Sequence, residues 1–491
     1  MTKRTRIAHL ALLLTAACAV YANSIGNDFV WDDVDLIKDN PVIRDLGNLP
    51  KLATTSYWDL GRPGERVPAN YRPLTVATFL LNYQIAGADP AAFRVVNVAL
   101  HAASTCLVYL LCAALGVSGG AALAAGLLFA VHPVHVEAVV WITGRAELLA
   151  SLGVLAAALL HLRQRRDGSP SLLAAAVACF VLALLSKESA IAFVAIVVCL
   201  ELTLAAADGA TVARLRSRLL SCLPYVVACL AYLGVRWTVV GVEDRGSGVG
   251  TFFAGSTAPE IFLTMVKVFA RYWGLLLFPV KLSAHYDQVD VPLPETLLEP
   301  SFLAAVAVNL AVLVAIVALF RTRRHLAAFA LAWVPLALLP YSHLIHFEWL
   351  MAERFLYLAS IGISLGAALA IDAARRTSWA RPRPAARALV AAGVCALGLL
   401  AVRTLARNRD WAHETDFFAA LAREKPNLPG ARLSYGKALW EAGRYDEAIV
   451  EYEEVLRLSP DVPGAAEGLR ILRFLRAAQR PVPRNEPARA P

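Results

Sequence analysis

The chain has 491 residues, of which 58% are hydrophobic and 17% are charged, and its mean hydropathy is +0.56. This composition excludes an ordinary soluble domain and predicts a polytopic membrane protein. The formal net charge of +9 does not indicate a nucleic-acid partner, because most of the excess lies in short loops between apolar segments. The eight cysteines lie in or at the ends of apolar segments, and no disulfide framework or zinc spacing is visible.

The apolar segments have roughly the length that a bilayer requires, about 20 residues. Together they predict an all-α, polytopic helical membrane protein with about 11 spans. We place these spans at 7–22, 94–115, 119–131, 148–162, 171–185, 190–206, 219–239, 302–320, 326–341, 355–371 and 388–404.

The first span, 7–22, follows a short basic start and ends on small residues near Ala22. The same pattern fits a cleavable signal peptide. A retained anchor is favoured, because the chain beyond it is polytopic. Lipid attachment at Cys18 is a third alternative, although the residues before it match poorly. Every alternative delivers Asn23 to the outer side.

Basic residues between the spans set the orientation, because Lys and Arg near span ends are retained on the cytoplasmic side. If all five basic groups are cytoplasmic, the segment 259–280 cannot cross the membrane without inverting everything after it. Lys267 and Arg271 lie one helical turn apart in this segment, which favours an interfacial amphipathic helix. The five groups are Lys3, Arg4 and Arg6; Arg163, Arg165 and Arg166; Arg214, Arg216 and Arg218; Arg321, Arg323 and Arg324; and Arg375, Arg376, Arg381 and Arg383.

This orientation places the long segment 23–93 on the outer side. The segment contains Asp32-Asp33 shortly after the first span and Tyr71-Arg72 before the next one. A carboxylate near the membrane surface can act as a general base. Adjacent aspartates are also ordinary caps of helix N-termini, so a catalytic and an ordering role are both open for each residue.

Further acid–base clusters lie on the same side and supply more candidates for substrate binding. Structural roles are the alternative, because a lone cation at the interface is usually an anchor and neighbouring charges can form ion pairs. Mixed charges near membrane depth nevertheless favour a functional site. With Tyr71 and Arg72, the candidates are His132, His135, Glu137, Arg145, Glu147, Lys187, Glu188, Glu353 and Arg354.

A divalent metal is a further alternative at one of these clusters. His132, His135 and Glu137 are the residues that would hold it, because all three approach one place if a helix begins at Pro133. Their spacing is not a strong metal signature. No cofactor is therefore assigned.

The composition changes after the membrane domain, 1–405, to a soluble helical pattern over 406–480. Phe418 and Tyr452 are 34 residues apart, which is the tetratricopeptide period. One full repeat stands between two half-repeats, so the segment is too short for an autonomous solenoid. The tail 481–491 is rich in proline and arginine and is predicted to be disordered.

Six motifs of the predicted outer side follow one another in a family order. They are Phe29-Val30-Trp31-Asp32-Asp33, Tyr71-Arg72-Pro73-Leu74, His132-Pro133-Val134-His135-Val136-Glu137, Gly144-Arg145-Ala146-Glu147-Leu148-Leu149, Ser186-Lys187-Glu188 and Glu353-Arg354-Phe355-Leu356-Tyr357-Leu358. This set resembles the transmembrane and tetratricopeptide-repeat-containing O-mannosyltransferases, of the GT-C class of glycosyltransferases. Phe355 and Ala359 depart from the family's usual tyrosine and proline.

The resemblance implies a GT-C-like membrane domain and a polyprenyl-phosphate sugar as donor. It also implies that an aspartate of the first outer loop is the catalytic base; Asp33 is slightly favoured over Asp32. Cations would stabilise the phosphate that leaves, and the fork of arginine suits phosphate oxygens. The cations available for this role are Arg72, Arg145, Lys187 and Arg354.

We therefore expect a membrane glycosyltransferase that moves mannose or a similar hexose from a polyprenyl phosphate to an acceptor hydroxyl, such as a protein Ser or Thr, with inversion. Residue usage rich in alanine, arginine and leucine favours a bacterial inner membrane, with the site and the repeats facing the periplasm. A transporter or flippase for a lipid-linked intermediate is one alternative, although repeated halves and mid-span charges are not seen. A non-catalytic membrane scaffold is the other.

Overall fold

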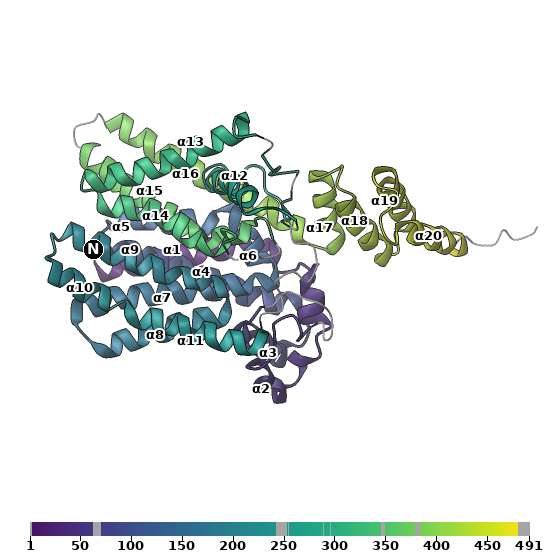
Figure 1. The fold of residues 1–491 in the computed structure, drawn as a ribbon, viewed down its shortest axis with the longest axis horizontal. Helices are drawn as coiled ribbons and strands as arrows, with labels where there is room; N and C mark the ends of the chain where they lie inside the picture. The colour runs from purple at the N-terminus through teal and green to yellow at the C-terminus, as the bar shows by residue number, and fades with distance from the viewer. Residues whose placement is uncertain are drawn as a thin grey trace, which may run out of the picture. The chain divides into compact units, whose positions relative to one another are not determined.

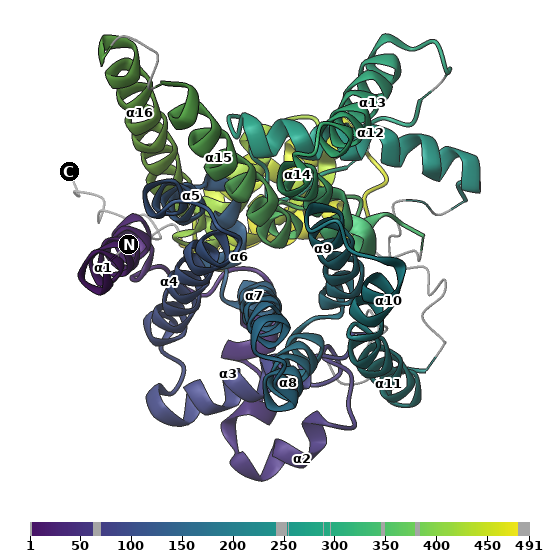
Figure 2. The ribbon, with the colours of Figure 1, turned by 90° about the vertical axis from the view of Figure 1, so that its left-hand side faces the viewer.

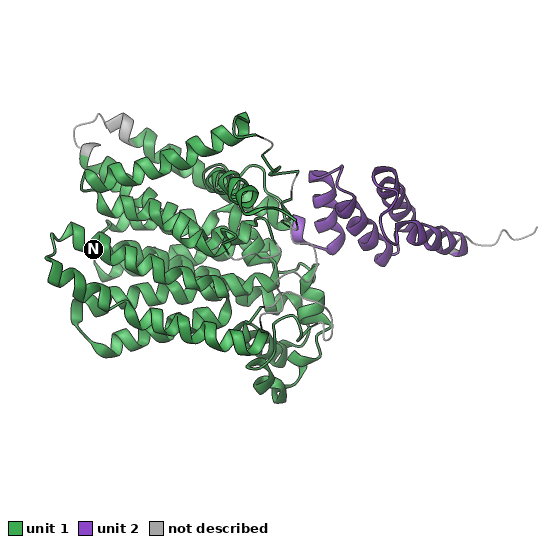
Figure 3. Ribbon diagram, in the orientation of Figure 1, with its two compact units in different colours: residues 1–409 green, residues 410–491 purple. Residues whose placement is uncertain are grey.

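The computed structural model describes residues 2–61, 70–241, 253, 255–287, 289–294, 296–344, 349–378 and 383–479. Over these residues the structure is helical and contains no β-strand, which confirms the predicted all-α class. The chain divides into two compact units, Met1–Arg409 and Asp410–Pro491 (Figure 3). The predicted disordered tail, 481–491, lies outside the described residues.

The first unit is a bundle whose long helices lie side by side (Figure 1). Single turns of 3-10 helix at η5 (Pro133–His135), η6 (Ile142–Gly144), η7 (Glu188–Ile191) and η9 (Glu353–Phe355) separate some of them. The helices are α1 (Lys3–Tyr21), α2 (Leu49–Leu52), α3 (Pro73–Ala86), α4 (Pro90–Ala114), α5 (Gly119–Val131), α6 (Val136–Val140), α7 (Arg145–Asp167), α8 (Pro170–Ser186), α9 (Ala192–Ala207), α10 (Val212–Leu220), α11 (Leu223–Val240), α12 (Ala258–Leu277), α13 (Pro300–Arg321), α14 (His325–Leu338), α15 (Leu356–Ser378) and α16 (Arg383–Arg407).

Several of these helices are suited to cross a membrane. Within the described residues, eight segments are long and apolar enough: Lys3–Ser24, Pro90–Ala114, Ile142–Asp167, Glu188–Ala207, Val212–Val240, Pro300–Arg321, Glu353–Arg376 and Arg387–Trp411. A ninth candidate, Gly119–Val131 with Pro133–Val140, is bent by 50° at a proline that opens a new turn. The remaining predicted spans coincide with two shorter apolar helices, Pro170–Ser186 and His325–Tyr341. The chain is thus a multi-pass integral membrane protein.

The two ends of the bundle carry different parts of the chain. In Figure 1 the N-terminus and α10 lie at one end, whereas α2, α3 and α6 lie at the other. The first end carries basic groups that the sequence assigns to the cytoplasmic side. The second end carries the acid–base motifs and the segment that the sequence predicts to be the first outer loop, and we call it the site end.

The helix α12 runs in a different direction from its neighbours. It is seen end-on in Figure 1 and crosses the view in Figure 2, where the bundle is viewed along its length. Glu260, Lys267 and Arg271 interrupt its apolar residues, and α12 is not among the spanning candidates of the described residues. This transverse course favours an interfacial position for the segment 259–280, which remains a prediction.

The segment before α3 folds into a small body instead of an open loop. Its residues Ile37, Tyr57 and Leu60 are buried together with Phe79 of α3 and Phe93 of α4. Burial of aromatic and aliphatic side chains is the main source of its stability. The first outer loop is therefore held in a fixed place at the site end.

The second unit consists of α17 (Glu414–Glu424), α18 (Pro429–Glu441), α19 (Tyr445–Leu458) and α20 (Ala465–Gln479). Tyr452 of α19 lies between Gly436 of α18 and Gly468 of α20. A Cβ atom added at these glycines would come within 2.8 Å and 2.5 Å of the tyrosine ring. Only glycine permits so close an approach, and an aromatic ring that fills an inter-helix gap is what the 34-residue period predicts.

Candidate active site

Asp33 is fully buried and ties the first outer loop to the membrane helices. Its carboxylate accepts hydrogen bonds from the backbone amides of Thr143 (2.9 Å), Ile142 (3.3 Å) and Val30 (3.4 Å). Burial raises the pKa of Asp33 to about 6, although the charge of Arg94 and the three amides act in the opposite direction. A carboxylate enclosed in this way is better suited to order the loop than to meet a substrate.

Arg94 of α4 holds the same loop. Its guanidinium donates hydrogen bonds to the carbonyls of Asn27, Asp28 (2.7 Å) and Val140 (3.0 Å), which its five N–H donors allow. The sequence patterns did not single out Arg94, because an arginine at the start of an apolar span resembles an interfacial anchor. The sequence signal that could have identified Arg94 is its position within the predicted span 94–115, where a charged residue is unusual.

Asp32 lies beside Asp33 but is less enclosed, with 9% of its surface exposed. The preceding residue, Trp31, has a φ of +59°, a conformation that is rare for a bulky side chain and is often found at functional sites. The Trp31 ring stacks on Trp141, with centroids 5.2 Å apart, and meets Trp349 edge-on at 5.4 Å. Aromatic contacts therefore fix the backbone that presents Asp32.

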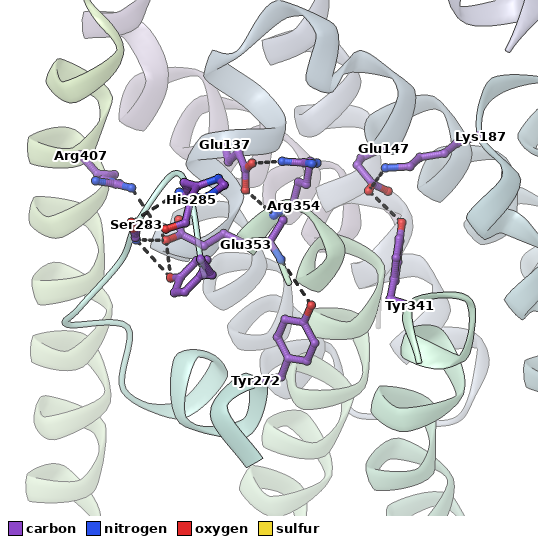
Figure 4. Close-up of polar contacts among 12 residues, drawn as sticks. Glu137, Glu147, Lys187, Tyr272, Ser283, His285, Tyr341, Glu353, Arg354 and Arg407 are labelled. Carbon is purple, nitrogen blue, oxygen red and sulfur yellow. Dashed lines mark hydrogen bonds and ion pairs between the residues drawn. The ribbon is translucent and has the colours of Figure 1, made fainter. Parts of the chain in front are cut away.

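Glu137 of α6 and Arg354 of η9 form a buried ion pair (Figure 4). The backbone amide of Arg354 also donates a hydrogen bond to the Glu137 carboxylate, at 2.8 Å. The guanidinium lies over the rings of Trp141 and Trp349, at 5.3 Å and 4.8 Å from their centroids. These are the two rings that Trp31 contacts, so the first loop and Arg354 meet at the same pair of tryptophans.

Lys187 and Glu147 form a second buried ion pair, also drawn in Figure 4. The hydroxyl of Tyr341 donates a hydrogen bond to the same carboxylate, at 3.0 Å. Lys187 lies at the break between α8 and η7, and its ammonium group is 5.3 Å from the centroid of the Phe355 ring. Arg354 lies over the same ring, at 5.0 Å. Both cations therefore lie beside the Phe355 ring.

Arg72 and Glu188 form a third ion pair, with 3.0 Å between Nε and Oε2. The backbone amide of Tyr71 donates to the other oxygen of Glu188, at 2.7 Å. The guanidinium of Arg72 lies over the ring of Tyr57, at 5.1 Å. Burial raises the pKa of the Tyr57 hydroxyl; the charge of Arg72 acts to lower it, and the charge of Asp32 acts to raise it further. This pair therefore lies on the side of the paired aspartates.

The cations Arg72, Lys187 and Arg354 gather in one region of the site end. Burial lowers the pKa of Lys187 to about 8; Glu147 opposes this effect, and repulsion from Arg72 and Arg354 lowers the pKa further. Mutual repulsion of this kind needs charges that lie close together. We call these three residues the cation cluster. Each of them was predicted as a phosphate contact.

Arg145 has a different environment from the cation cluster. It is fully buried, and its guanidinium donates to Asn97 Oδ1 (2.8 Å), Asn82 Oδ1 (3.0 Å) and the carbonyls of Phe93 (2.8 Å) and Thr78 (3.3 Å). These neutral groups already occupy the donors of the arginine fork. The geometry therefore favours a structural role for Arg145 over the predicted contact with phosphate.

Glu353 is next to Arg354 in the chain but contacts a different group of residues. Its carboxylate accepts hydrogen bonds from the Ser283 amide (2.5 Å) and the Tyr286 hydroxyl (2.9 Å) and lies 3.8 Å from Arg407. Figure 4 shows this group beside the Glu137–Arg354 pair. The arrangement fixes the segment after α12, which favours a positioning role for Glu353.

His132 and His135 have partners other than a metal or a substrate. The Nε2 of His132 donates to the carbonyl of Leu276, at 3.0 Å, and the Nε2 of His135 lies 2.8 Å from the hydroxyl of Ser360. Glu137, the third member of the predicted cluster, is paired with Arg354. Within the described part of the chain, no group of three or more His, Cys, Asp or Glu residues could hold a metal ion.

Comparison with known proteins identifies relatives of this chain, although no protein-family model matches it. The chain is 30% identical to protein O-mannosyl-transferase Tmtc3 of Drosophila melanogaster, over 92% of the chain and 55% of that protein. It is 29% identical to protein O-mannosyl-transferase TMTC1 of Homo sapiens, over 94% of the chain and 56% of that protein. The chain thus spans about half the length of these curated relatives.

These matches confirm the predicted resemblance: the chain is similar in sequence to protein O-mannosyl-transferases over more than nine tenths of its own length. Among solved structures, ArnT from Cupriavidus metallidurans has a TM-score of 0.40 and 15% identity in the apo state, over 94% of this chain and 72% of that one. The structure of ArnT bound to undecaprenyl phosphate has a TM-score of 0.40 and 14% identity, over 95% and 78% of the two chains.

Proposed function

We propose that this protein is a membrane glycosyltransferase that moves mannose, or a similar hexose, from a polyprenyl phosphate to an acceptor hydroxyl. A serine or threonine of a protein is the expected acceptor, since the curated relatives are protein O-mannosyl-transferases. The observation that carries the proposal is the cation cluster, which lies at the site end together with Asp32, whose surface is 9% exposed whereas that of Asp33 is fully buried. Purified protein in lipid should release polyprenyl phosphate from the matching donor, and failure with every polyprenyl-phosphate sugar would contradict it.

In the proposed reaction, Asp32 accepts the proton of the acceptor hydroxyl as its oxygen attacks the anomeric carbon. The bond between that carbon and the phosphate oxygen breaks, and the phosphate leaves with the electron pair. A single displacement inverts the anomeric centre. We assign the base to Asp32 instead of Asp33, because three backbone amides hold the Asp33 carboxylate in a fully buried place.

The cation cluster would stabilise the phosphate as its charge develops. Arginine offers two parallel donors to phosphate oxygens, and lysine offers a point charge. The paired carboxylates, Glu137, Glu147 and Glu188, balance the cations in the resting enzyme and hold each one in place. Preorganised cations of this kind need little rearrangement during the reaction.

Lys187 gives the proposed site a characteristic pH dependence. Its pKa is lowered to about 8, so its charged form is lost as the pH rises through that value. We expect kcat/KM for the donor to fall above about pH 8, and Lys187→Arg to move this fall to higher pH, because arginine keeps its charge. Identical alkaline limbs in the two pH profiles would contradict a role of Lys187 in phosphate binding.

We also propose that the site end and the second unit face the extracytoplasmic side, the periplasm if the chain is bacterial. The five basic groups support this orientation. A fluorescent reporter that folds only in the cytoplasm should be silent when fused after Gln479 and bright when the chain is cut and fused after Arg166. A bright fusion after Gln479 would place the second unit in the cytoplasm and overturn the orientation.

A further inference from the structure

The helix α10 lies at the end of the bundle opposite the proposed active site (Figure 1). It carries Arg214, Arg216 and Arg218 among the exposed apolar residues Val212 and Leu220. A helix with arginines among apolar side chains is suited to lie in the interface of a membrane. The reaction at the site end uses none of these residues.

Asp208, in the turn before α10, fixes the position of this helix. Its carboxylate binds both Arg218 and Arg165 of α7, with 2.9 Å in each contact. Arg165 also lies 3.4 Å from the buried Glu201 of α9. These two carboxylates balance two arginines, so the charges of this network cancel.

Arg214 and Arg216 are not part of that balance. Both are exposed, and within the described part of the chain neither makes an ion pair or a hydrogen bond through its side chain. The surface of α10 therefore presents two positive charges without carboxylate partners. An anionic group is the partner that fits them.

Two apolar grooves adjoin α10, with volumes of about 470 Å³ and about 450 Å³. Leu215 of α10 lies between them and lines both. The first groove runs between α9, α13 and α14 and is lined by Leu202, Ala206, Leu215, Ile316, Phe320 and Phe329. The second lies between α9, α10 and α11 and is lined by Val198, Val212, Leu215, Arg216, Leu219 and Val226.

We propose that this face binds one anionic diacyl phospholipid, with its chains in the two grooves and its phosphate on Arg216, which lines the second groove. Arg214 lies on another side of α10 and adds to the positive potential that attracts the headgroup. Two apolar grooves of similar size beside one basic helix match a ligand that has two hydrocarbon chains and one negative headgroup. The volumes are within the range of ordinary ligand sites, and the charge favours an anionic over a zwitterionic headgroup. The site is independent of the transferase chemistry proposed above.

The test compares lipid retention by the purified full-length protein and its variants in detergent, measured by native mass spectrometry. The wild type should retain phosphatidylglycerol in preference to phosphatidylcholine. The double variant Arg214→Ala/Arg216→Ala should weaken this retention roughly thirtyfold, as expected for two arginines at an anionic surface. The matched control Arg4→Ala/Arg6→Ala removes two exposed arginines of α1 and should retain the lipid as the wild type does.

A second variant tests the grooves. Ala206→Phe fills the first groove without a change in charge, and it should also reduce retention of phosphatidylglycerol. Equal retention of the two lipids by the wild type, or unchanged retention in the Arg214→Ala/Arg216→Ala protein, would overturn the proposal. Displacement of the lipid by inorganic phosphate alone would also overturn it, because the grooves would then contribute nothing.

Discussion

The variant Asp32→Asn is expected to reduce the rate of sugar transfer by about a hundredfold or more, the usual loss when a general base is removed. Asparagine has nearly the shape of aspartate but cannot take the proton of the acceptor hydroxyl. Thermal stability and donor binding should remain close to those of the wild type. The measurement is the single-turnover rate with saturating polyprenyl-phosphate sugar, together with donor affinity.

The matched control for this variant is Asp33→Asn. In this variant an amide nitrogen would face backbone N–H groups that now donate hydrogen bonds to the carboxylate. Each buried group left without a hydrogen bond costs about 1–3 kcal/mol. We therefore expect a lower unfolding temperature as the primary effect. The opposite result would be a stable Asp33→Asn protein without transfer activity and a fully active Asp32→Asn protein. It would make Asp33 the general base and Asp32 the residue that orders the loop.

Arg354→Met should destabilise the membrane domain strongly, because it leaves Glu137 as an unpaired charge in a buried place. Breaking a buried pair on one side typically costs about 3–5 kcal/mol. The double variant Glu137→Gln/Arg354→Met removes both charges and should recover most of the stability. It should still lack donor binding, because the cation is gone.

Thermal unfolding of the two proteins, together with their donor affinity, separates stability from function. The control Arg444→Met breaks an exposed pair with Glu447 and should change the unfolding temperature little. Equal stability of the Arg354→Met protein and the double variant would show that the loss of Arg354 does not leave Glu137 as a costly unpaired charge. If the double variant binds donor normally, Arg354 is not a phosphate contact.

Hydropathy was sufficient to predict where the membrane helices lie, because a bilayer imposes the same length and composition on every span. The predicted number of spans, about 11, exceeds the eight or nine segments that satisfy the length criterion. The difference comes from Pro170–Ser186 and His325–Tyr341, which are apolar but short, and from the bend at Pro133. The sequence also did not indicate that the first outer loop has a core of its own, because its apolar residues follow no simple period.

The sequence identifies the acid–base residues of the candidate site but not the partners with which they form ion pairs. Glu137 pairs with Arg354, which is 217 residues away, and Arg72 pairs with Glu188 at a separation of 116. Neighbours in sequence serve different partners: Lys187 faces Glu147 while Glu188 faces Arg72. Adjacent side chains diverge at the breaks between helices, so proximity in sequence is a poor guide to ion pairs there.

The configuration of the sugar linkage in the product tests the central claim most directly. Purified protein would be given a polyprenyl-phosphate hexose of known anomeric configuration and a peptide that contains Ser and Thr, and the glycopeptide would be analysed by NMR. Single displacement with Asp32 as base predicts an inverted linkage, one polyprenyl phosphate released per peptide modified, and no product from Asp32→Asn. A retained configuration, or transfer without release of polyprenyl phosphate, would contradict the account.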